Sequence, residues 1–143
     1  MITGIHHINL VVPPGTLAAA TAFYGETLGL TARPVPAQGG ALAWFDVGPP
    51  SSSSAGGHHQ QQVHIAYGEP DDFVFASSKR HPCFRVGSGD ELLELRRRIY
   101  AHFERGGEGA PLAADKPGEE SSGAKGAEFP QRFFARDYAG NRL

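Results

Sequence analysis

The sequence lacks several features that would mark a secreted, membrane-bound or nucleic-acid-binding protein. It contains a single cysteine, Cys83, so the chain can form no internal disulfide, which suits a reducing compartment. No apolar run approaches the length of a membrane span, and the first residues lack the basic and apolar regions of a signal peptide. We therefore expect a cytoplasmic protein with no membrane partner.

A strong excess of charge of either sign is also missing, because the formal net charge is −2. The one basic cluster, Arg96–Arg98, falls in an expected helix and is typical of a solvated helix face. Without a basic surface there is no electrostatic argument for nucleic acid as a partner. The 143 residues suffice for one domain with its own hydrophobic core.

The first half of the chain shows the patterns of several half-buried strands and one helix. The strands are expected at residues 5–12, 31–35, 41–47 and 62–67. The helix is expected to run to about Leu28, with Thr16 as its N-terminal cap and Gly29 in the left-handed position after its end. Residues 49–61, rich in serine, glycine and glutamine, are typical of a loop.

The second half repeats this order of elements. Its strands are expected at 81–86, near 111–115, at 131–136 and from Asn141 onward. A capping-box pattern at Ser88 predicts the start of a helix that runs to about Arg105. His102 lies in this helix among charged residues, so we expect its side chain in solvent. The order predicts an α+β fold of two modules, over about 1–68 and 81–143.

Three histidines share a position that suits metal binding. His7, His64 and His81 each lie on the polar side of an expected strand, opposite the apolar residues that would pack on a helix. A metal site needs several ligands that converge from different strands on one face of a sheet. The parity of these residues is compatible with a shared site, although each histidine alone is more typical of a structural residue.

Two further residues share the parity of His81. Arg85 on that side is a candidate for binding an anionic substrate group, with an exposed arginine at a strand edge as the alternative. Cys83 is more typical of a small apolar filler than of a reactive group.

Segments along nearly the whole chain resemble one superfamily. The segments are GIHHINLVV, AFYGETLGL, LAWFDVG, QQVHIAYG, HPCFRV and FFARDYAGNRL. They are similar to the successive segments of the vicinal oxygen chelate superfamily, which includes glyoxalases, extradiol dioxygenases and bleomycin-resistance proteins. The resemblance implies a glyoxalase-like fold, in which two paired β-α-β-β-β modules form a curved mixed sheet around a cup. It also implies a homodimer.

The resemblance also implies roles for individual residues. His7, His64 and His81 match positions of metal ligands in the superfamily, for a divalent ion such as Ni, Co, Mn, Fe or Zn. The fourth ligand of the family is a glutamate one position after the hydrophobic residue that Leu143 matches, which lies beyond these 143 residues. A bound metal would act as a Lewis acid on a substrate that chelates it through adjacent oxygens.

Three functions follow from the sequence as alternatives. The first is a metal-dependent enzyme, a lyase or isomerase or a dioxygenase, that acts on a small substrate. The second is a metal-free protein that binds or sequesters a small molecule, such as a drug, as bleomycin-resistance proteins do. The third is a degenerate structural or interaction module. The residues do not identify the substrate, and no acid or base for catalysis is evident among them.

Overall fold

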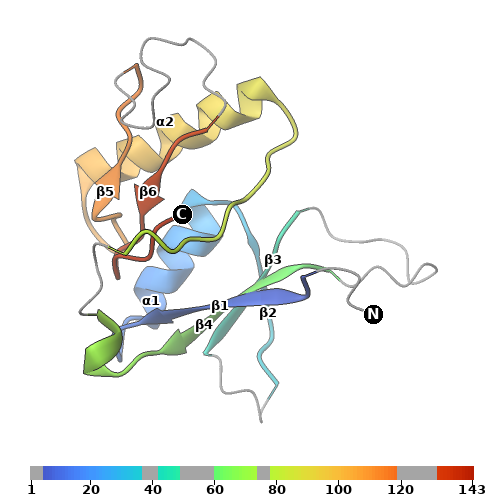
Figure 1. Ribbon diagram of the computed structural model, residues 1–143, viewed down its shortest axis with the longest axis vertical. Coiled ribbons are helices and arrows are strands. Elements are labelled where there is room, and N and C mark those ends of the chain that lie inside the picture. Colours follow the sequence, from blue (N-terminus) through green and yellow to red (C-terminus); the bar gives the residue numbers. More distant parts are fainter. Residues whose placement is uncertain (1–4, 37–41, 49–59, 74–77, 119–131) are drawn as a thin grey trace, which may run out of the picture.

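The computed structural model describes residues 5–36, 42–48, 60–73, 78–118 and 132–143. Its larger elements follow the order strand, helix and three strands, then helix and two short strands (Figure 1). This is the mixed α+β fold that the sequence predicts. None of the helices among the described residues is both long and apolar enough to cross a membrane.

The first half of the chain builds a four-stranded sheet in the order β1-β4-β3-β2. The central strand β4 (Gln62–Tyr67) pairs in parallel with β1 (His7–Val12) and antiparallel with β3 (Ala43–Asp46). The edge strand β2 (Thr31–Arg33) pairs antiparallel with β3. All four strands predicted for this half are therefore confirmed, several of them with shorter ends.

One continuous helix packs on this sheet. It begins as α1 (Leu17–Ala20) and continues as the π-helical segment η1 (Thr21–Thr27). Gly29 follows it with φ +77°, the left-handed conformation expected at that place. The expected cap is wrong in detail, because the Thr16 hydroxyl donates to the carbonyl oxygen of Pro13 at 2.7 Å and caps no helix N–H.

The long helix of the second half, α2 (Gly89–Arg105), begins as the capping-box pattern predicts. The backbone N–H of Glu91 donates to the Ser88 hydroxyl at 3.2 Å, and the Glu91 carboxylate accepts from the backbone N–H of Gly87 at 2.7 Å. The carboxylate therefore bonds one residue earlier than in the standard motif. The helix ends at Arg105, and Gly106 follows it with φ +69°.

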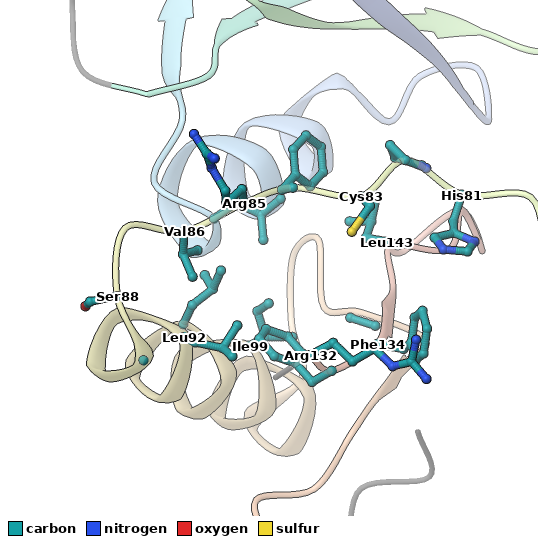
Figure 2. A pocket seen from close by; sticks show the side chains of 17 residues that line it. His81, Cys83, Arg85, Val86, Ser88, Leu92, Ile99, Arg132, Phe134 and Leu143 are labelled. Atoms are coloured by element: carbon teal, nitrogen blue, oxygen red, sulfur yellow. The ribbon is translucent and has the colours of Figure 1, made fainter. Parts of the chain in front are cut away.

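The strand predicted at residues 81–86 is not formed. Side chains of this segment alternate between exposed and half-buried, as the pattern indicated, but no described strand pairs with it. The strands β5 (Ala113–Ala114) and β6 (Ala135–Arg136) make a separate two-stranded sheet, and Arg136 makes one further bridge to Arg142. Between residues 81–86, α2 and β6 lies a cavity of about 600 Å³ (Figure 2).

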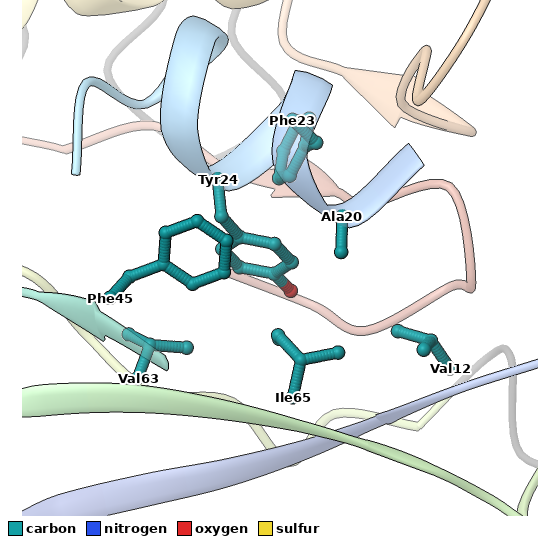
Figure 3. Packing of buried hydrophobic residues seen from close by; sticks show 7 residues of the cluster. All are labelled: Val12, Ala20, Phe23, Tyr24, Phe45, Val63 and Ile65. Atoms are coloured by element: carbon teal, nitrogen blue, oxygen red, sulfur yellow. The ribbon is translucent and has the colours of Figure 1, made fainter. Parts of the chain in front are cut away.

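The hydrophobic core lies between the first sheet and the helix formed by α1 and η1 (Figure 3). Its fully buried members are Val12, Ala20, Phe23, Tyr24, Phe45, Val63 and Ile65. Strand alternation explains this set, because Val63 and Ile65 of β4 point to the helix while His64 between them points away from it.

Two buried hydrogen bonds join the halves of the molecule. The Tyr24 hydroxyl donates to Asp137 Oδ2 at 2.6 Å. The Thr27 hydroxyl lies 2.6 Å from Nδ1 of His102, and the His102 Nε2 donates to the backbone oxygen of Glu108 at 3.0 Å. The prediction of a solvent-exposed His102 is therefore wrong, because α2 turns this face toward η1.

Candidate functional site

Two of the three predicted metal-ligating histidines, His7 and His64, lie side by side on the face of the first sheet turned away from the helix. Strand register brings them together, because His64 pairs with Asn9 of β1 and with Trp44 of β3. The His64 ring stacks on the His7 ring at 4.1 Å between centroids and on the Trp44 ring at 4.2 Å. We call Trp44, His64 and His7 the ring row.

A chain of polar contacts orients the central ring of this row. Nε of Arg33 lies 3.0 Å from Oδ2 of Asp46, whose Oδ1 accepts from Nε2 of Gln62 at 2.8 Å. The side-chain oxygen of Gln62 is then left to accept from Nε2 of His64 at 2.9 Å. This order assigns the proton of the neutral His64 ring to Nε2.

The surroundings of His64 favour its neutral form. Its pKa is lowered from the ordinary value of 6.5, chiefly because burial disfavours the charged ring, and also because His7 and His6 repel the added proton. A neutral imidazole can ligate a metal or accept a hydrogen bond. The His64 ring of the ring row is therefore favoured in the neutral form that can act in either of these ways.

The arrangement of the three predicted ligands does not fit a shared metal ion. An imidazole directs its nitrogen lone pair within the plane of the ring. The His7 and His64 rings are stacked with 12° between their planes, so their nitrogens point along nearly parallel planes. Nowhere in the described ranges do three His, Cys, Asp or Glu side chains form a group that could hold a metal. The three-histidine site stays a prediction, and we derive no reaction step through a metal.

His81, the third predicted ligand, lies on the other half of the molecule, at an exposed position. Its Nδ1 donates to the backbone oxygen of Lys79 at 2.7 Å. Its ring meets Phe134 edge-on at 5.5 Å between centroids. The guanidinium carbon of Arg142 lies 3.8 Å from the centroid of the same Phe134 ring, in cation–π geometry. His81, Phe134 and Arg142 thus form one cluster.

This cluster borders the cavity of about 600 Å³, which we call the apolar cavity. Most of its walls are apolar side chains from α2, from the segment before it, from the end of the first helix and from the last residues. They include Leu28, Val86, Leu92, Leu95, Ile99, Phe133, Phe134 and Leu143. His81, Cys83 and Arg85 line it from the segment above α2, although the Arg85 guanidinium points away from its centre (Figure 2).

A second hollow of about 950 Å³, the groove, lies between β1, residues 78–83 and residues 140–142. Its lining is more polar than that of the apolar cavity and includes Asn9, Asp72, Arg80, Asn141 and Arg142. His81, Pro82 and Cys83 line both hollows, so the two share a wall.

Sequence patterns did not identify two of these residues as site residues. Trp44 belongs to the ring row because of the register between β3 and β4, which a single sequence does not reveal. Arg142 belongs to the cluster because Phe134 and the turn at 137–140 bring it beside His81. The signal for Trp44 was its alternation with the buried Phe45, which placed it on the polar face.

Comparison with known proteins supports the fold. No family model matches the chain, and no curated protein matches it. A solved structure from Bacillus anthracis, described as a "putative glyoxalase family protein", superposes with a TM-score of 0.60 at 26% sequence identity. The match covers 99% of this chain and 92% of that one. The predicted glyoxalase-like fold is confirmed, and the neighbour is consistent with the vicinal oxygen chelate superfamily.

Proposed function

We propose that this chain is a small-molecule-binding protein with a glyoxalase-like fold, and that its ligand occupies the apolar cavity. The volume and lining of that cavity carry the proposal. About 600 Å³ falls within the range typical of small-molecule pockets, which are mostly apolar with a few polar groups. Here the polar residues of the lining are His81, Cys83, Arg85, Ser88 and Arg132. They include His81, which the sequence predicted as a metal ligand, and Arg85, which it predicted as a substrate-binding residue.

Binding of a neutral apolar dye, such as N-phenyl-1-naphthylamine, tests this proposal. We expect its fluorescence to rise on binding and the Leu92→Trp variant to weaken that binding by about tenfold, because the larger side chain fills the cavity. Leu112→Trp is the matched control, since Leu112 is 59% exposed and lies outside the cavity lining. Absence of dye binding, or equal loss in both variants, contradicts the proposal.

A metal-dependent enzyme of the lyase or dioxygenase type is the second candidate. The observation that favours it is the pairing of His7 with His64 on one sheet face, together with Nδ1 atoms of His6 and His7 only 3.1 Å apart. Two such nitrogens could serve as neighbouring ligands once the rings rotate to face one ion. The homodimer and the cytoplasmic location likewise remain proposals from the sequence.

Trp44 provides the readout for this second candidate, because it is the protein's only tryptophan and stacks on His64. Titration with Ni, Co, Mn, Fe or Zn is expected to change its fluorescence if the ring row holds the ion. His7→Ala and His64→Ala should each abolish tight binding. His58→Ala, a change in the serine- and glycine-rich segment 49–61, should not. No response to any of these ions, or equal losses in all three variants, counts against a metal site.

A further inference from the structure

We infer that the ligand of the apolar cavity is an amphipathic anion, whose apolar body lies in the cavity and whose acidic head lies in the groove. This inference rests on the proposed function, and it adds the chemical class of the ligand. It follows from the relation between the two hollows and from the charges that each of them carries.

The two hollows adjoin each other along one short stretch of chain. His81, Pro82 and Cys83 belong to both linings, so the apolar cavity and the groove are separated by a single stretch of chain. Phe134 marks the same boundary, because its ring is a wall of the cavity while Arg142, stacked on it at 3.8 Å, lines the groove. We infer that a ligand whose apolar part contacts Phe134 in the cavity can place its head beside Arg142.

The charge at this boundary is positive although the whole chain is slightly negative. Arg80 and Arg142 line the groove beside His81, and Asp72 is the one carboxylate among the described residues of that lining. The Asp72 Oδ2 accepts from the backbone N–H of Glu69 at 2.8 Å, and its carboxylate can offset only one of the two guanidinium charges. The described lining residues therefore carry a net positive charge, which favours an anionic head such as a carboxylate or phosphate.

The two arginines of the groove also distinguish between head groups. An anionic head is attracted to Arg80 and Arg142, whereas a cationic head is repelled by them. His81 is held at the boundary of the two hollows by the hydrogen bond from its Nδ1 to the Lys79 backbone oxygen. The groove is thus suited to an acid rather than to an alcohol or an amine.

Three ligands that differ only in their head group test the inference. Decanoate, decanol and decylamine compete with N-phenyl-1-naphthylamine for the intact protein. We expect decanoate to displace the dye at a concentration about tenfold lower than decanol, and decylamine to be the weakest competitor. Arg142→Gln should remove most of the advantage of decanoate over decanol and Arg142→Lys should restore part of it. Arg97→Gln, at an exposed position on α2 outside both linings, should change nothing.

Cys83 offers a second measurement that does not depend on a variant. It is exposed, it is the only cysteine and it lines both hollows, so alkylation of the chain reports on this one place. Decanoate should slow its alkylation more than an equal concentration of decanol. If the dye binds but decanol competes and protects as well as decanoate, the inference is overturned while the proposed function stands. If neither compound nor the dye binds, the proposed function fails as well.

Discussion

The two halves of this chain carry similar sequence patterns but differ in how completely they form their strands. In the first half, four predicted strands join one sheet, and a helix covers it. In the second half, the helix forms as predicted, but β5 and β6 have two residues each and residues 81–86 join no described sheet. The comparison teaches that alternation predicts which way side chains point, whereas a strand also requires a partner for its backbone.

The two halves also differ in how tightly their side chains are packed. Every strand of the first sheet except the short edge strand β2 contributes fully buried side chains to the core. On the second half, the apolar stripe of α2 includes Leu92 and Leu95, which remain half-buried because they face the apolar cavity. Stability is therefore expected to reside mainly in the first half, and the capacity to admit a ligand in the second.

A matched pair of isoleucines tests that division, and we expect this to be the largest effect. Ile65→Ala in the core should lower the free energy of unfolding by about 4 kcal/mol, because a close-packed site leaves a new cavity. Ile99→Ala should cost about 2 kcal/mol, since Ile99 already borders the apolar cavity. Urea denaturation of both variants measures the difference, and equal losses would show that the halves are packed alike.

Alanine substitutions at two glycines in the loop that follows α2 test the contact between the halves. At Gly109, with φ +69°, an added Cβ would lie 2.5 Å from the backbone oxygen of Ala19 in α1. At Gly107, with φ +92°, an added Cβ would meet no atom within 4 Å. Gly109→Ala should cost about 3 kcal/mol from steric clash and backbone strain, and Gly107→Ala about 1 kcal/mol from strain alone. Similar unfolding curves for both variants would mean that the loop moves away from α1 at little cost.

The sequence predicted those elements of the fold that are determined by neighbouring residues, and it failed for those that depend on distant ones. The helix α2 was predicted closely because Ser88, Glu91 and the terminal glycines act within a few residues. The strand at 81–86 was predicted wrongly because pairing is a long-range property that alternation does not encode. His102 was misplaced for a similar reason, since its partner Thr27 lies on a distant helix.

The residues of the candidate site also differ in whether a local pattern could place them. Parity correctly placed His7 and His64 on one sheet face, because side-chain direction alternates strictly along a strand. Parity could not tell whether His81 would reach them, as this depends on how the second half packs. The cluster of His81, Phe134 and Arg142 had no local signal, because Arg142 reaches the Phe134 ring only through the turn at residues 137–140.

The smallest expected effect concerns His64, the central ring of the ring row. Because its pKa is lowered, the unfolded chain binds a proton more readily than the folded protein. The stability that His64 contributes is therefore complete above about pH 6.5 and is lost as the pH falls through the lowered value. His64→Gln should flatten the decline in melting temperature between pH 7 and pH 5. His7→Gln should flatten this decline only in part. The change removes a ring that both buries His64 and repels a proton on it, but the His64 ring itself remains. Trp44 fluorescence over the same pH range is a second readout, because the Trp44 ring stacks on the His64 ring. If the melting temperature of His64→Gln declines with pH as in the unmodified protein, His64 does not contribute to stability in this way.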